Sequence, residues 1–158
     1  MDANLKKVLD KHISDQSLSI ILNQFNIYTT NLILSQLNPS IHTISLSHNS
    51  IQEFKGNINA FTHLETVDIS LNSICDLGSL AQCQSLKHLN LSYNLFQNIE
   101  HFENLSHLKS LDIGYNNIAY IEGLDNLVNL EELILSCNKI DSLQSKIPNR
   151  SEYACKTG

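Results

Sequence analysis

The sequence repeats itself with a period of 22 residues, and this periodicity limits the possible folds more than any other feature. Four successive segments, which begin at Leu64, Leu86, Leu108 and Leu130, share the pattern LxxLxLxxNxIxxIxxLxxLxx. A fifth segment begins at Ile41 and contains one additional residue. Because a unit of this length cannot bury its apolar face alone, we expect successive units to stack into a solenoid.

Each repeat has two halves with different periodicities. In LKHLNLSYN, which begins at Leu86, the apolar residues Leu89 and Leu91 alternate with polar ones, and this alternation predicts a short strand. In the second half, Ile99, Phe102 and Leu105 recur every three residues, which predicts helical or 3-10 turns. The sequence therefore predicts an α/β fold with a parallel sheet on one side and short helical turns on the other.

An asparagine occupies the same position in all five repeats. This position accounts for five of the 19 asparagines in the 158-residue chain, which also contains 25 Leu and 18 Ile. The asparagines of this position are Asn49, Asn72, Asn94, Asn116 and Asn138.

The pattern resembles the 22-residue class of leucine-rich repeat, which is named after a regulatory subunit of protein phosphatase one. The resemblance covers residues 41 to about 143. It implies a leucine-rich repeat solenoid with the sheet on the concave side and the helical or 3-10 turns on the convex side. It also implies that the asparagine side chains turn inward and bond buried backbone groups of the loop after each strand, which is a structural role.

The residues before the first clear repeat are expected to form a degenerate repeat and a cap. In residues 18–40, Ile20, Leu22 and Ile27 have the spacing of the repeat, and Phe25 takes the place of the asparagine. Terminal repeats are often atypical in this way. Residues 1–17 are predicted to form an N-terminal capping helix. Its apolar face is expected to contain Leu5, Val8, Leu9 and Ile13.

The C-terminal end departs from the pattern. We expect the five repeats to span residues 41–151 and the tail 152–158 to lack a recognisable cap. Lys146 and Asn149 stand where the preceding repeat has leucine. Three explanations remain open at this stage: an atypical cap built by the tail, a truncated or alternatively spliced product, and a fragment of a longer protein.

The charge distribution favours a protein partner. Between Leu64 and Leu135 there are ten acidic residues and two lysines, which disfavours direct contact with nucleic acid or an anionic membrane. Such a segment favours a partner with a basic face. The N-terminal residues do not resemble a signal peptide, and no apolar run is long enough to span a membrane.

The cysteines indicate the compartment in which the protein works. Cys75, Cys83, Cys137 and Cys155 form no CxxC motif and suggest free thiols in a reducing compartment. We therefore expect an intracellular, cytoplasmic protein, with cytoskeletal, ciliary and nuclear locations left open.

We expect the partner to bind the exposed strand positions on the concave face and the loop after each strand. The eighth position of the repeats places Tyr93 beside Tyr115, and surface tyrosines are frequent hot spots of binding. The alternative is that these tyrosines only cover one another and the asparagine loops. The residues expected to bind the partner are Tyr93, Tyr115, Leu71, His48, Asp68, Asn90, Asp112, His88 and Glu132.

The search for catalytic chemistry yields one weak set. Ser110, His88 and Asp68 are expected to lie near one another, but on an open face without a nucleophile elbow or oxyanion donors. The histidines and cysteines do not show metal-ligand spacing, and there is no phosphate-binding loop. We therefore expect no enzymatic activity, no metal and no cofactor.

The sequence as a whole predicts a non-catalytic scaffold that binds another protein. The partner is expected to contribute a basic and apolar surface. Similar repeats occur in a phosphatase regulatory subunit, in ciliary and centrosomal proteins, in a spliceosomal adaptor and in the endosomal protein nischarin. One alternative is therefore a phosphatase regulatory subunit or a ciliary, centrosomal or spliceosomal adaptor. A second alternative is a secreted adhesin, because bacterial internalins use a similar 22-residue repeat. The sequence does not determine the oligomeric state.

Overall fold

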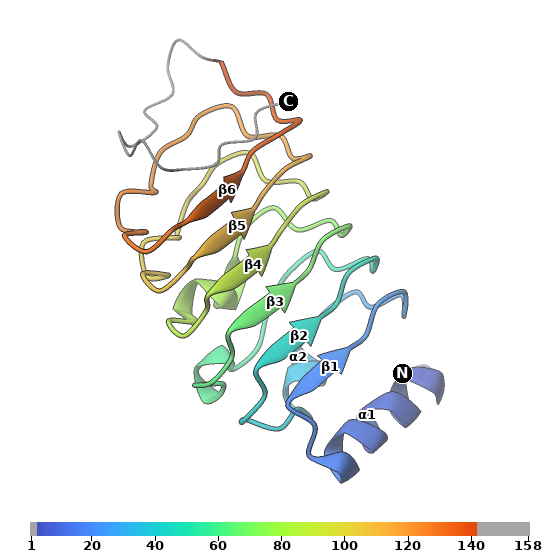
Figure 1. The fold of residues 1–158 in the computed structure, drawn as a ribbon. Helices are drawn as coiled ribbons and strands as arrows, with labels where there is room; N and C mark the ends of the chain where they lie inside the picture. The colour runs from blue at the N-terminus through green and yellow to red at the C-terminus, as the bar shows by residue number, and fades with distance from the viewer. Residues whose placement is uncertain (1–2, 142–158) are drawn as a thin grey trace.

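The computed structural model describes residues 3–141 and shows a solenoid with one open sheet of six parallel strands (Figure 1). The strands follow one another across the sheet in the order of the sequence, one from each coil. This arrangement confirms the predicted solenoid with a parallel sheet along one side. The strands are β1 (Ser19–Ile21), β2 (Thr43–Ser45), β3 (Thr66–Asp68), β4 (His88–Asn90), β5 (Ser110–Asp112) and β6 (Glu132–Ile134).

Neighbouring strands pair without any offset between repeats. Val67 of β3 lies opposite Leu89 of β4, which in turn lies opposite Leu111 of β5. Each position of the repeat therefore becomes a row of residues that crosses the sheet. The central row points into the core and consists of Ile20, Ile44, Val67, Leu89, Leu111 and Leu133.

The side opposite the sheet is built from short helices and turns. The first three coils contain α2 (Asn31–Leu34), η1 (Ile58–Ala60) and η2 (Gly78–Gln82). In the next coil the backbone forms isolated turns instead, closed by a bond from the Leu105 amide to the Phe102 carbonyl, which are 3.0 Å apart. The three-residue spacing serves both arrangements, because Phe102 and Leu105 are fully buried in this coil as well.

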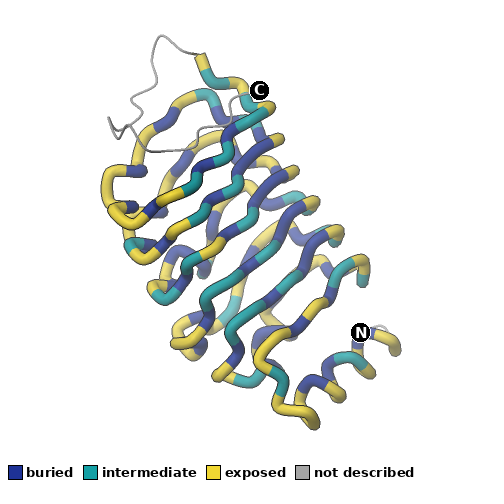
Figure 2. Tube along the Cα trace, in the orientation of Figure 1, coloured by how far each residue is buried: buried dark blue, intermediate teal, exposed yellow. Residues whose placement is uncertain are grey.

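One continuous hydrophobic core runs between the two sides, from Leu5 to Leu135. Figure 2 shows buried residues in every coil, with exposed residues concentrated in the bends. The largest fully buried side chains are Phe54, Phe96 and Phe102. Because each coil packs mainly on its neighbours, the stack is stabilised by nearest-neighbour contacts.

Helix α1 (Ala3–Asp15) lies at the β1 end of the sheet (Figure 1). Leu5 and Leu9 are buried in the common core, but the prediction that Ile13 shares this face is wrong, since Ile13 is 49% exposed. The buried residue of the last turns is His12, which is 4% exposed. Residues 5, 9 and 12 are separated by steps of four and three residues and form one stripe of the helix. Residue 13 lies about 100° around the helix from residue 12.

The later part of the fifth repeat lies outside the described residues. The unusual Lys146 and Asn149 and the tail 152–158 belong to this part of the chain. Within residues 3–141, no helix combines the length and the apolar character that a membrane crossing requires.

Candidate functional site

The five repeated asparagines form a ladder of internal hydrogen bonds. Asn94 is typical: its side-chain oxygen accepts a bond from the Ile74 amide at 3.0 Å, and its side-chain nitrogen donates to the Ile69 and Leu91 carbonyls, both at 3.0 Å. The ladder therefore pairs backbone groups that would otherwise be buried without partners. Equivalent bonds are formed by Asn49, Asn72, Asn116 and Asn138.

The residue before each asparagine adopts a left-handed backbone conformation, with φ between 53° and 56°. The amides of four of these residues donate to a carbonyl of the next coil: His48 to Ser70, Leu71 to Ser92, Tyr93 to Gly114 and Tyr115 to Ser136. These bonds hold one exposed residue of each coil in a row where the strands end. We call His48, Leu71, Tyr93, Tyr115 and Cys137 the rim row.

Tyr93 and Tyr115 of the rim row are stacked. Their ring centroids are 4.0 Å apart and their planes differ by 8°. The two residues remain 45% and 46% exposed, so stacking covers only part of each ring. Hydrogen bonding to Cys137, and secondly to Tyr93, raises the pKa of Tyr115 to about 12. The stack is a fixed aromatic surface that both rings help to hold in place.

Polar residues at the strand ends lie next to the rim row in the sequence. Asp68, Asn90 and Asp112 each accept a hydrogen bond through the side-chain oxygen Oδ1 from the amide two residues further on, at 3.0 Å. All three are half-buried. This bond fixes each side chain between the end of its strand and the rim row.

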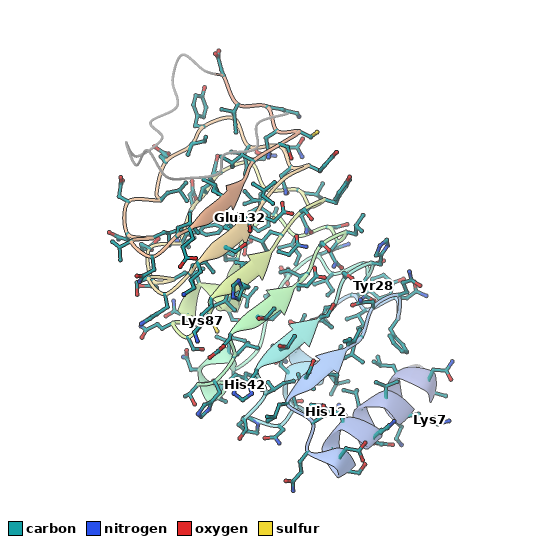
Figure 3. All side chains as sticks on the ribbon, viewed as in Figure 1. Lys7, His12, Tyr28, His42, Lys87 and Glu132 are labelled. Carbon is teal, nitrogen blue, oxygen red and sulfur yellow. The ribbon has the colours of Figure 1, made fainter. Side chains whose placement is uncertain are left out.

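The lysines of the sheet lie on the opposite side, where the strands begin. Lys87 pairs with Glu65 at 2.7 Å and Lys109 with Glu131 at 3.4 Å. Hydrogen bonding to Lys87 lowers the pKa of Glu65. Figure 3 shows Lys87 and His42 on this side of the sheet.

These ion pairs were not predicted from the sequence. The second position contains the signal, because the parallel register places residue 65 beside residue 87, and residue 109 beside residue 131. Within residues 3–141, Asp68 and Asp112 at the strand ends form no ion pair. The two lysines are therefore already paired where the strands begin, whereas Asp68 and Asp112 have no paired cation among the described residues where the strands end.

The proposed catalytic set is not brought together by hydrogen bonds. His88 is exposed on β4 and lies opposite Ser110, but the Ser110 hydroxyl donates to Glu132 at 3.0 Å. Asp68 lies opposite Asn90, two residues along the strand from His88. Glu132, labelled on β6 in Figure 3, therefore orients Ser110. In the part of the chain that the structure describes, no three His, Cys, Asp or Glu side chains are grouped to hold a metal ion.

Two residues of the first coil have roles that were not predicted. The side-chain oxygen of Asn23 accepts bonds from the Ser45 hydroxyl at 2.8 Å and the Ser47 amide at 2.9 Å. The buried Thr30 hydroxyl donates to the Lys55 carbonyl at 2.7 Å. Asn23 was detectable from its alignment with Ser47, whereas nothing in the repeat pattern indicates Thr30.

The comparisons with known proteins agree with this fold. The family model described as Leucine Rich repeats (2 copies) matches residues 84–126 and residues 106–149. No curated protein matches the sequence. A leucine-rich repeat protein of Leptospira interrogans has a similar structure, with 27% identity and a TM-score of 0.64 over 70% of this chain. This chain spans only 29% of the length of that protein.

Two internalins of Listeria monocytogenes are also similar in structure. Internalin C2 is 19% identical, with a TM-score of 0.62, over 99% of this chain and 93% of its own length. The internalin inlF is 23% identical, with a TM-score of 0.52, over 84% of this chain and 48% of its own. These two likenesses show the fold alone. The chain thus contains leucine-rich repeats and folds as a leucine-rich repeat solenoid, an architecture that generally serves as a non-catalytic scaffold for protein–protein interaction.

Proposed function

We propose that this protein is a non-catalytic scaffold of the 22-residue repeat class that binds another protein on the sheet face, along the rim row. The observation that carries the proposal is the stacked pair of Tyr93 and Tyr115, whose side chains are nearly half exposed and whose backbone amides bond the next coil. Tyrosines that are already ordered lose little conformational entropy when a partner binds, so they gain affinity efficiently.

The neighbours of the stack favour a partner surface that is both apolar and basic. Leu71 extends the stack along the rim row and is 37% exposed. Asp68 and Asp112 lie beside the row without a cation among residues 3–141. An approaching basic surface would meet these carboxylates without competition from Lys87 and Lys109, which are already paired.

We also propose that the protein works inside the cell. Cys75 and Cys137 are exposed free thiols and Cys83 is a buried one. Burial raises the pKa of Cys83, which keeps that thiol protonated. Free thiols of this kind are typical of a reducing compartment and support an intracellular location.

Affinity purification from cells that naturally make the protein tests the scaffold function. The wild type is compared with the double variant Tyr93→Arg, Tyr115→Arg. The matched control is Tyr28→Arg, Tyr120→Arg, because these tyrosines are 67% and 49% exposed and lie outside the rim row. Circular dichroism establishes that all three proteins fold.

The proposal predicts that the rim double variant loses a protein partner that the wild type and the control variant both retain. Two arginines at the rim row remove the stacked aromatic surface and reverse its complementarity to a basic partner. A partner that is retained by the rim variant and lost by the control variant would place the interaction elsewhere on the molecule.

A further inference from the structure

The N-terminal helix α1 has a polar side chain in the face that packs on the solenoid. The buried residues of α1 are Leu5, Leu9 and His12, and only 4% of His12 is exposed. Both ring nitrogens of His12 are buried, and neither has a hydrogen-bond partner in the part of the chain that the structure describes. Buried polar atoms are normally paired, so this imidazole is held at a cost that a leucine in its place would avoid.

The first two coils offer no counter-charge to His12. The stretch from residue 16 to residue 52 contains β1, α2 and β2 and has no Asp, Glu, Lys or Arg. Its ionisable side chains are Tyr28, His42 and His48. Because tyrosine and histidine are not anions near neutral pH, a proton taken up by the buried imidazole would stay uncompensated from this side.

The charges of α1 itself compensate such a proton poorly. The carboxylates of Asp10 and Asp15 are exposed, and the Asp15 carboxylate already accepts a hydrogen bond from the Ser14 hydroxyl at 3.0 Å. Water screens an exposed carboxylate, so it stabilises a buried charge only weakly. The exposed lysines of the helix add charge of the unfavourable sign: Lys6, Lys7 and Lys11.

Protonation of His12 therefore opposes the packing of α1 in particular. Burial lowers the pKa of His12 below its ordinary value of 6.5, and the backbone of Ser19 compensates only part of this effect. The strands are joined to one another by backbone pairing, whereas α1 contributes to the core through Leu5, Leu9 and His12. When one of these three side chains is charged, the helix loses buried contacts that it needs, because a helix of 13 residues is marginal by itself in water.

We propose that His12 is an acid-sensitive latch, whose protonation releases α1 from the end of the solenoid while the parallel sheet stays folded. The last turn of α1, where Figure 3 labels His12, leads through residues 16–18 into β1. The strand pairs begin at Ser19, so α1 can move away without breaking them. Release exposes Leu5 and Leu9 and uncovers the first coil, which creates an apolar surface that is absent at neutral pH. The latch is independent of the proposed function, because it involves no residue of the rim row.

Amide hydrogen exchange of the full chain tests the latch. Exchange is measured at about pH 7 and about pH 5 and corrected for the intrinsic rate at each pH, so that protection factors report how often each element opens. On release, His12 regains its ordinary affinity for protons, so the protection of α1 is expected to drop by up to about 25-fold between these pH values. The amides of α1 are also expected to be less protected than those of β4, because the helix opens without the sheet.

Three variants identify the group responsible. His12→Leu removes the titrating group, and His12→Gln keeps a polar side chain that does not titrate, so both are expected to abolish the drop in α1 protection. His12→Gln also decides the question if the leucine variant fails to fold. The matched control is His42→Gln, which removes a half-buried histidine directly before β2 and is expected to leave the drop unchanged. Circular dichroism establishes that each variant folds.

Any of three outcomes would overturn the latch. Equal protection of α1 and β4 at the lower pH would show that the helix opens only when the whole solenoid unfolds. A drop that persists in both His12 variants, or that is lost in His42→Gln, would assign the acid sensitivity to another group. Unchanged protection of α1 in the wild type between the two pH values would show that protonation of His12 does not control the docking of the helix.

Discussion

At the scale of single residues, the asparagine ladder and the rim row depend on one local backbone design. The residue before each asparagine adopts the left-handed conformation, which costs a residue with a side chain roughly 1 kcal/mol. The following asparagine offsets this cost by donating to its own coil and to the preceding one, as Asn94 does to the carbonyls of Leu91 and Ile69. The buried structural position and the exposed position of the row are therefore adjacent in every repeat.

Replacing Asn94 by alanine is expected to lower the free energy of unfolding by roughly 1–3 kcal/mol, because the Ile74 amide and the Ile69 carbonyl lose buried partners. Urea unfolding measures the difference. Asn98→Ala is the control, since Asn98 is exposed and its side chain bonds the exposed Glu100. Equal urea midpoints for the two variants would contradict the structural role of the ladder.

His12 is expected to make the stability depend on pH. Burial lowers its pKa below the ordinary value of 6.5, and the backbone of Ser19 partly offsets this effect. The unfolded chain therefore binds a proton at a higher pH than the folded chain. The resulting stability is fully present above pH 6.5 and is lost as the pH falls from there through the lowered pKa of the folded state.

The variant His12→Leu is expected to flatten the pH dependence between neutral and mildly acidic solution. Thermal unfolding across this range measures the effect. His101→Gln is the control, because the His101 side chain is 68% exposed. A slope that persists unchanged in His12→Leu would assign the pH dependence to other groups.

At the scale of elements, one turn between two coils depends on a close backbone approach. Gly78 lies at the start of η2 with a φ of 53°, and a Cβ there would lie 2.2 Å from the Phe54 carbonyl oxygen of the preceding coil. Neither the conformation nor the distance tolerates a side chain. The turn between these coils therefore requires glycine.

Gly78→Ala is expected to destabilise the protein by roughly 1–3 kcal/mol, from backbone strain and displacement of the preceding coil. Gly114→Ala is the matched comparison, because Gly114 is not left-handed and its nearest contact would be 3.2 Å. Gly114→Ala is expected to lose less free energy of unfolding than Gly78→Ala. Chemical unfolding of both variants measures the two losses in free energy. A larger loss in Gly114→Ala than in Gly78→Ala would contradict this prediction.

The repeat made most of the elements predictable. Once Leu89 and Leu91 were recognised as inward residues of a strand, the position of every later strand followed from the period. Helices were less predictable, because a spacing of three residues suits both the 3-10 helix η2 and the isolated turns around Phe102. The prediction for the buried face of α1 was wrong at Ile13. The sequence of the helix alone does not show that packing on the first coil buries His12 instead.

The candidate site was predictable to a similar extent. The adjacency of Tyr93 and Tyr115 followed from the period, whereas the parallel stacking of their rings required coordinates. The pairing of Lys87 with Glu65 depends on the register between two coils and emerges only when the second position of each repeat is compared. The hydrogen bond from Ser110 to Glu132 likewise depends on the direction of two side chains.

At the scale of the whole molecule, the sheet face is divided along its length. The lysines and their glutamate partners lie where the strands begin, while the tyrosines and the carboxylates of Asp68 and Asp112 lie where the strands end. Because the strands pair in one register, each group of residues lines up across neighbouring coils. The account therefore predicts that a partner contacts the strand ends.

Photo-crosslinking in the cells that make the protein tests this central claim most directly. Benzoylphenylalanine replaces either Tyr115 in the rim row or Tyr120, which is similarly exposed and lies outside it. The account predicts a protein adduct from position 115 that is absent from position 120. An adduct from position 120 alone, or equal adducts from both positions, would contradict the claim that the rim row is the binding surface.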